Sequence, residues 1–158
     1  MRESQCEDLA MGDVSPFQGV HLHHIARETS DVNRLVDFYQ QVFGFKKLET
    51  PQSFGDFNVT WLHLPPIYSL HVVERDPKSR LPESPFVVPS DANADVSALW
   101  RGPHLSFRVS DYDAAINTLK AKDIKYFEKT QQGGKVKQCF FFDPDGNGLE
   151  IGNWPTPA

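Results

Sequence analysis

The strongest constraint on the fold of this chain is an internal repeat. The stretch HIARETSDVNRLVDFYQQVFGF, which begins at His24, matches the stretch HLSFRVSDYDAAINTLKAKDIKYF, which begins at His104. Each begins with a histidine, carries Ser-Asp soon after it, and then enters a segment whose apolar residues recur at helical spacing. Such a repeat predicts two copies of one supersecondary unit in which a first strand leads into an amphipathic helix.

The second part of each copy also matches. WLHLPPIYSLH (61–71) overlays FFFDPDGNGLE (140–150), which pairs Trp61 with Phe140 and His71 with Glu150. Gly133-Gly134 and Pro144-Asp145-Gly146 mark hairpin turns in the second half, so each half predicts strand, helix, strand, strand, strand. We therefore expect an α+β fold of two paired βαβββ modules. The expected divisions are a flexible acidic tail (1–17), the first module (18–76), a connecting loop (77–101) and the second module (102–156).

Composition excludes several functional classes. The net charge is −5 and the 16 Lys and Arg residues are scattered, which argues against a nucleic-acid partner. The two cysteines, Cys6 and Cys139, form no C-x-x-C motif, which argues against a disulfide framework or a thiolate zinc site. No run approaches the roughly 20 apolar residues that span a bilayer, and the first residues lack the apolar core of a signal peptide. We expect a cytoplasmic protein with a small-molecule substrate.

Four metal-competent residues occupy positions that the repeat makes equivalent. His24 and His104 lead the first strands, and His71 and Glu150 lie in the last strands. A carboxylate buried on a sheet is costly unless a cation or hydrogen-bond donors meet it. If the two modules pair face to face, three imidazoles and one carboxylate meet in one cleft. That ligand set suits a divalent ion such as Zn, Ni, Co, Mn or Fe.

For the other histidines and for the aromatic residues, the sequence gives weaker evidence of a role in the predicted site. His24 alone in HLHHIARET has a repeat partner, so His21 and His23 are expected to be bystanders, with His23 on the opposite sheet face. His63 is either a cleft-lining hydrogen-bonding group or a buried structural histidine. Trp61 and Phe140 fit a sheet core, and if they face the cleft they suit an apolar or aromatic substrate. The candidate substrate-binding residues are Trp61, His63 and Phe140.

The paired modules, the helix end DFYQQVFGF and the closing DPDGNGLEI resemble the vicinal oxygen chelate superfamily, most of all glyoxalase I, the lactoylglutathione lyases. The resemblance covers residues 18 to about 156, and it implies that the two paired βαβββ modules form a curved mixed sheet around a metal cleft. It implies metal ligands at His24, His71, His104 and Glu150, with Glu150 also serving as the catalytic base. It further implies a metal-dependent lyase or isomerase that acts on an α-hydroxycarbonyl or related substrate through an enediolate.

The sequence departs from the glyoxalase I pattern at two places. Glyoxalase I enzymes usually carry a carboxylate where this chain has His71, so a bound ion here keeps more positive charge. The position at which the resemblance calls for an arginine that holds glutathione is Glu28, and the adjacent Arg27 belongs to the opposite strand face. These residues argue against the use of glutathione.

Several functions stay open on the sequence alone. One alternative is a non-catalytic small-molecule binding protein of the same fold, and another is a glutathione-independent isomerase or aromatase of secondary metabolism. His24, His104 and Glu150 also make the two-histidine, one-carboxylate set of non-haem iron dioxygenases, an interpretation that we rank below the lyase or isomerase. The modules can pair within one chain or across a homodimer.

Overall fold

A computed structural model describes residues 22–49, 58–66, 68–79, 95–131 and 133–155. The predicted tail (1–17) and most of the predicted connecting loop lie outside these residues. The elements, in chain order, are β1 (Ile25–Thr29), α1 (Val32–Phe43), β2 (Lys46–Lys47), β3 (Val59–Leu64), β4 (Tyr68–Glu74), η1 (Val96–Arg101), β5 (Leu105–Arg108), α2 (Tyr112–Ala121), β6 (Tyr126–Thr130), β7 (Lys137–Phe142) and β8 (Gly148–Gly152). Each half runs strand, helix and three strands, as the repeat predicts.

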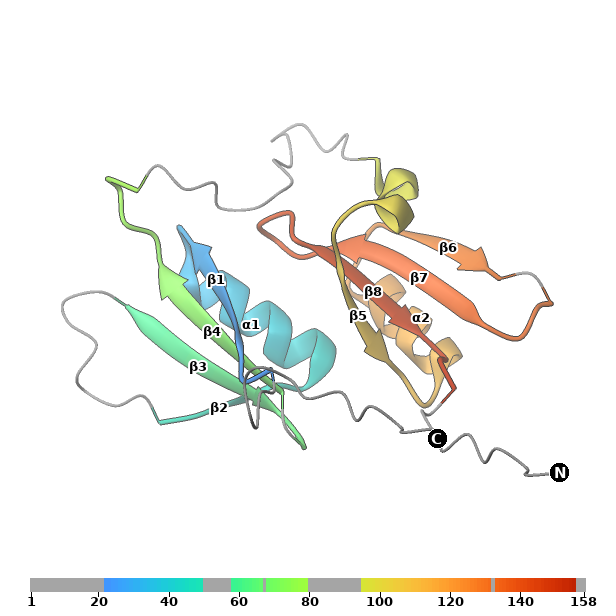
Figure 1. Cartoon of the computed structure of the whole chain (residues 1–158), viewed down its shortest axis with the longest axis horizontal. Coiled ribbons are helices and arrows are strands. Elements are labelled where there is room, and N and C mark those ends of the chain that lie inside the picture. Colours follow the sequence, from blue (N-terminus) through green and yellow to red (C-terminus); the bar gives the residue numbers. More distant parts are fainter. Residues whose placement is uncertain (1–21, 50–57, 67, 80–94, 132, 156–158) are drawn as a thin grey trace, which may run out of the picture.

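The strands form two four-stranded mixed sheets that lie side by side (Figure 1). Their orders are β1-β4-β3-β2 and β5-β8-β7-β6. The first strand of each half pairs in parallel with the last, and the other neighbours are antiparallel. The predicted fold of two βαβββ modules is confirmed. Among the described residues, the two sheets are not hydrogen-bonded to each other, so β1 and β5 are both edge strands.

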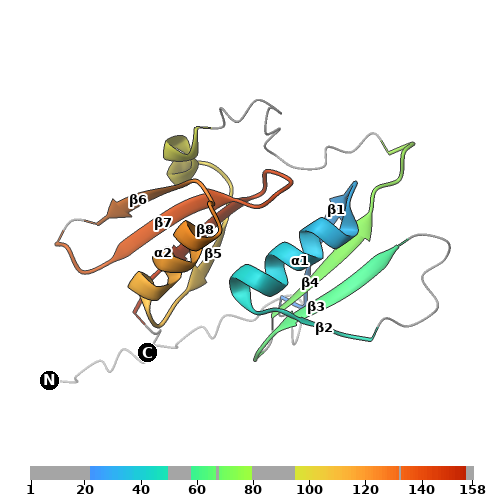
Figure 2. The same ribbon diagram turned by 180° about the vertical axis from the view of Figure 1, so that it is seen from behind.

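Each sheet carries its own helix on one face, and Figure 2 shows α1 and α2 in front of their sheets. The α1 helix begins after Asp31, whose carboxylate accepts a hydrogen bond from the Arg34 backbone N–H at 3.0 Å. It ends at Gly44, which has the left-handed conformation that glycine adopts without a steric penalty. The N-cap Asp31 is the second residue of the Ser-Asp pair that the repeat contains.

The two modules contact each other on the helix side of the sheets. The Phe43 ring at the end of α1 lies 4.4 Å from the Phe107 ring of β5 and stacks 6.0 Å from the Phe141 ring of β7. Nearby, the Tyr39 hydroxyl donates a hydrogen bond of 3.0 Å to the buried Asp143 carboxylate. Aromatic packing and a buried hydrogen bond therefore hold α1 of the first module against the sheet of the second.

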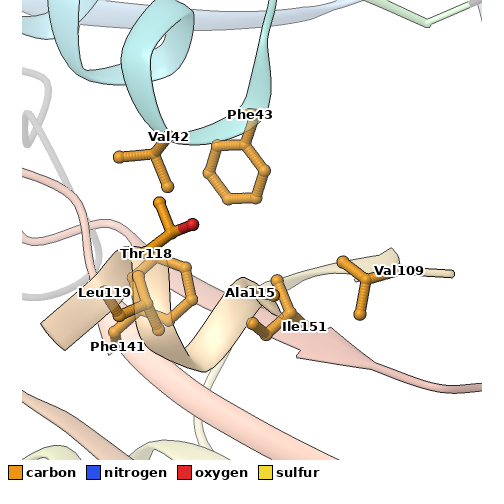
Figure 3. A pocket seen from close by; sticks show the side chains of 8 residues that line it. All are labelled: Val42, Phe43, Val109, Ala115, Thr118, Leu119, Phe141 and Ile151. Carbon is orange, nitrogen blue, oxygen red and sulfur yellow. The ribbon is translucent and has the colours of Figure 1, made fainter. Parts of the chain in front are cut away.

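A small apolar pocket of about 50 Å³ lies at this same contact (Figure 3). Val42, Phe43, Val109, Ala115, Thr118, Leu119, Phe141 and Ile151 line it. Figure 3 shows the end of α1 above it and the second module below. Since its only polar side chain is Thr118, whose hydroxyl donates to the Ala114 carbonyl at 3.0 Å, it offers little to orient a polar substrate.

The end of the connecting segment packs on the second sheet. Val96 and Leu99 of η1 are buried, and η1 contacts β6 and β7. The end of the predicted connecting loop (77–101) is therefore ordered against the second module. In the part of the chain that the structure describes, neither α-helix is long and apolar enough to cross a membrane.

Candidate metal and substrate site

The predicted site residues project from the sheet faces opposite the helices. On the first sheet, Trp61 is the cross-strand neighbour of His71. On the second, Phe140 and Ser106 flank Glu150 on neighbouring strands. Side chains of adjacent strands in register share one sheet face, so each module presents its own part of the predicted site on this face, called here the open face.

In the first module, the open face holds His24, His71 and Trp61. The rings of His24 and His71 lie edge to face with centroids 5.8 Å apart. Trp61 stacks on His71 at 4.2 Å and meets His24 edge-on at 4.9 Å. Burial, and then the neighbouring His24, lower the pKa of His71, which favours the neutral imidazole. Trp61 thus contacts both predicted histidine ligands and orients their rings.

The prediction that His23 points to the opposite face is wrong. The Nδ1 atoms of His23 and His24 lie 2.9 Å apart, and the His23 ring is 6.4 Å from that of Trp61. Both histidines precede β1, which begins at Ile25, so the alternation of side chains along a strand does not apply to them. His23 is a neighbour of the predicted ligand, and His21 lies outside the described residues.

His63 is two residues from Trp61 on β3 and shares its face. Its Nδ1 lies 3.3 Å from the Ser69 hydroxyl in a partly buried hydrogen bond. Of the two roles that the sequence left open, this contact favours a hydrogen-bonding group on the open face.

In the second module, His104 and Glu150 are in direct contact. The His104 Nε2 atom lies 2.9 Å from Glu150 Oε2, and the Glu150 residue is only 3% exposed. His104 Nδ1 donates to the Gly102 carbonyl at 2.8 Å, because a carbonyl oxygen can only accept. A neutral His104 therefore presents a lone pair at Nε2 to a carboxylate oxygen. Two such atoms at this distance need a proton or a cation between them.

Phe140 and Gln138 contact this pair, and Trp154 contacts the neighbouring Ser106; of these three, the sequence predicted only Phe140. The buried Phe140 ring lies edge to face with His104 at 5.5 Å. Gln138 donates from Nε2 to Glu150 Oε1 at 2.8 Å, and Trp154 donates from Nε1 to the Ser106 hydroxyl at 3.1 Å. Sequence reasoning missed Gln138 and Trp154. Gln138 precedes Phe140 by two residues and shares its strand face, a signal that was available, whereas Trp154 follows the repeat and has no counterpart.

The structure keeps the two halves of the predicted ligand set apart. Among the described residues, no group of three or more His, Cys, Asp or Glu side chains lies close enough together to hold a metal ion. His24 and His71 form one pair and His104 and Glu150 form the other. Each pair lies within one module, and the modules are joined on the helix side rather than through their open faces.

The His104 and Glu150 pair fits a divalent metal ion. Metal bonds of about 2.0–2.2 Å to nitrogen and oxygen place two neighbouring ligand atoms about 3 Å apart, close to the separation found here. The hydrogen bond from His104 Nδ1 to a backbone carbonyl is the usual way in which a ligand imidazole is oriented. Imidazole nitrogen and carboxylate oxygen are also ligands that Zn, Ni, Co, Mn and Fe accept.

Glu28 and Arg27 occupy opposite faces of β1. The Glu28 carboxylate accepts from the Asp76 backbone N–H at 3.2 Å and pairs with Arg75 at 3.5 Å. Arg27 lies on the helix side near Tyr68, where burial raises the pKa of the Tyr68 hydroxyl and the charge of Arg27 partly offsets that rise. The open face therefore has a carboxylate at the position where the glyoxalase I pattern has an arginine.

Comparison with known proteins places the chain among related folds. Residues 21–151 match the family model of the Glyoxalase/Bleomycin resistance protein/Dioxygenase superfamily. The chain is 28% identical to Glyoxylase I 4 of Arabidopsis thaliana, over 88% of this chain and 74% of that protein. It is 26% identical to a 2-epi-5-epi-valiolone epimerase of Actinomyces sp, over 88% of this chain and 82% of that protein. A solved glyoxalase family protein from Enterococcus faecalis superposes with a TM-score of 0.58 at 26% identity, covering 84% of this chain and 96% of that chain.

Proposed function

The chain belongs to the Glyoxalase/Bleomycin resistance protein/Dioxygenase superfamily, and we propose that it is a divalent-metal-dependent lyase or isomerase of α-hydroxycarbonyl or related small molecules. The observation that carries this proposal is the buried contact of His104 Nε2 with Glu150 Oε2, oriented by the Gly102 carbonyl. The donor set of that contact suits both metal binding and proton transfer.

The four metal ligands in this proposal are His24, His71, His104 and Glu150. A divalent ion bound by them would act as a Lewis acid toward neighbouring oxygens of the substrate. Glu150 moves the proton, since its carboxylate is enclosed by Phe140 and Gln138 and faces the open side of the sheet. A base that removes a proton beside a carbonyl and returns it is the chemistry of an isomerase, and the epimerase name of one relative agrees with it.

We propose that a second copy of the chain completes the site. In one copy, the first module holds two of the four ligands and the second module holds the other two. The contacts of Phe43 and Tyr39 with the second module keep these two pairs apart. His24 and His104 directly precede the edge strands β1 and β5, and His71 and Glu150 lie on the adjacent strands β4 and β8. A twofold dimer that sets the first module of one copy against the second module of its partner would bring all four ligands together, with two sites in each dimer.

The substrate in this proposal reaches the site without glutathione. Glu28 supplies no positive charge for the carboxylates of that peptide and is itself paired with Arg75, and Arg27 lies on the other side of the sheet. Trp61 and Phe140 supply aromatic surface on the open faces of the two modules, which suits a cyclic or otherwise apolar hydroxycarbonyl compound.

Metal binding tests the first part of the proposal. Protein stripped with a chelator and reloaded with Ni, Zn or Mn is expected to bind about one ion per chain. His104→Ala and Glu150→Gln should lose that ion, while the matched control His63→Ala should keep it. Metal content in the two site variants equal to that of the parent would refute the proposed ligand set.

Mixed dimers test the second part. One copy carries His24→Ala with His71→Ala, and its differently tagged partner carries His104→Ala with Glu150→Gln. If the site forms between copies, each mixed dimer regains one complete site from the two unaltered modules. If the modules pair within one chain, the mixed dimers bind no metal at all.

Solvent exchange tests the chemistry. Cyclic α-hydroxyketones and methylglyoxal, the latter with and without glutathione, are incubated with the metal-loaded protein in D₂O. We expect Glu150-dependent deuterium incorporation beside the carbonyl of a hydroxyketone, without glutathione. A small molecule that stays bound without metal or turnover would instead indicate a binding protein, and oxygen consumption by the iron-loaded protein would indicate a dioxygenase.

A further inference from the structure

The amide of Gln138 forms a hydrogen bond with one oxygen of the Glu150 carboxylate, which is the base in the proposed function. Its Nε2 donates to Glu150 Oε1 at 2.8 Å, while Glu150 Oε2 faces His104 at 2.9 Å. We propose that Gln138 is a positioning residue that fixes the Glu150 carboxylate, so that Oε2 alone binds the metal ion or carries the proton. This inference rests on the proposed function.

The register of the second sheet makes this contact feasible. Gln138 lies two residues before Phe140 on β7, and therefore on the open face, with Gly152 as its neighbour on β8. Since Gly152 has no side chain, the amide can reach diagonally to Glu150. A Cβ at Gly152 would lie only 2.6 Å from Nε1 of Trp154, so the same glycine also makes room for the indole beside Ser106.

A neutral amide is suited to this task. A hydrogen bond to a carboxylate is stronger than one between neutral groups and sets the orientation of the acceptor. A lysine or arginine at position 138 would neutralise Glu150 and compete with the metal ion for it. Gln138 instead holds the side chain and leaves its negative charge available to a cation or a proton.

Comparison of the two modules shows that the fold itself does not require a glutamine at position 138. Gln138 is the neighbour of Gly152, and the equivalent pair in the first module is Val59 and Val73. Both modules therefore form this part of the sheet, one with an apolar pair and one with an amide facing glycine. The amide accompanies the module that carries the carboxylate, which indicates a function at Glu150 rather than a structural need of the hairpin.

The test compares full-length chains that bind Co²⁺, an ion with a visible absorption spectrum that reports its ligands. Gln138→Met keeps the length of the side chain and removes the hydrogen-bond donor. Gln138→Asn keeps the donor but shortens the side chain by one methylene, which moves the donor away from Glu150. Gln131→Met is the matched control, because Gln131 is an exposed glutamine at the end of β6 in the same module. The dissociation constant for Co²⁺, the Co²⁺ spectrum, KM, kcat and Tm are measured for each.

We expect both Gln138 variants to bind Co²⁺ about tenfold to a hundredfold more weakly, with a changed spectrum, a lower kcat and a nearly unchanged KM. Gln131→Met should match the parent in every measurement. If Gln138→Met does not fold, Gln138→Asn decides the outcome. Variants with the affinity and spectrum of the parent would overturn this inference and leave the proposed function standing, whereas a parent that binds no Co²⁺ would overturn both.

Discussion

The Tyr39 hydroxyl of the first module donates a hydrogen bond to the Asp143 carboxylate of the second at 3.0 Å, and both side chains are buried. Asp143 also accepts bonds from the Asn147 backbone and side chain at 2.8 and 2.7 Å. This network ties α1 to the β7–β8 hairpin, and the burial of Tyr39, followed by the nearby Asp143, raises the pKa of the Tyr39 hydroxyl. The relative placement of the modules depends on it.

Tyr39→Phe is expected to lower the free energy of unfolding by about 1–3 kcal/mol, because it leaves a buried acceptor without one of its donors. Urea unfolding measures the change. The control is Asp113→Ala, which removes an ion pair with Lys137 in which both side chains are exposed, 82% and 47%; such pairs contribute about 0–1 kcal/mol. Equal effects of the two variants would contradict the assignment of Tyr39 to the main contact between the modules.

Asp143 predicts a pH dependence of stability. Burial raises its pKa above the ordinary value of 3.8, although Asn147 and Tyr39 act in the opposite direction. Between the unfolded and the folded pKa, the folded chain binds more protons, so a rise in pH through that interval lowers the free energy of unfolding. The advantage of the parent over Asp143→Asn should therefore be largest below the ordinary pKa and shrink toward neutral pH. Urea unfolding of both proteins across that range checks the sign, and an advantage that grows with pH would show that the donors outweigh burial.

Gly148 is expected to tolerate no side chain. A Cβ there would lie 2.5 Å from the backbone oxygen of Pro103 and 3.2 Å from the Cβ of His104. Gly148→Ala should destabilise the chain by about 1–3 kcal/mol and weaken metal binding, since relief of the contact moves the backbone next to His104. For stability, Gly152→Ala is the comparison, because the nearest atoms to its added Cβ belong to the Trp154 side chain, which can rotate away. Thermal unfolding of both variants tests the difference in stability, and metal titration of Gly148→Ala against the parent tests the effect on binding.

The repeat in the sequence was enough to predict the two modules. Both helices begin at the aspartate of a Ser-Asp pair, and Gly133, Gly134 and Gly146 have the positive φ angles that the predicted turns need. These features are local, so residue type and spacing carry them. The open faces are also predictable, because strand alternation places His71 and Glu150 on the side away from the helices.

Features that depend on contacts between distant residues were not predictable. The separation of the two ligand pairs results from Phe43 meeting Phe107 and Tyr39 meeting Asp143, and neither contact has a local signature. His23 was misplaced because β1 starts only at Ile25, so the alternation of side chains along a strand does not extend back to His23. The prediction of His24, His71, His104 and Glu150 as ligands stays a prediction, with geometry that supports each pair.

Trp61 supplies the last prediction, which concerns the first ligand pair. Its ring stacks on His71 at an interplanar angle of 13° and meets His24 at 4.9 Å, so it limits the rotation of both imidazoles. Trp61→Ala should weaken metal binding about tenfold, as the loss of a residue that orients ligands usually does. Trp100→Ala is the matched control, since Trp100 is 43% exposed on η1. Competition titration with a chelator measures both, and equal affinities of Trp61→Ala and the parent would show that the two histidines are oriented without the indole.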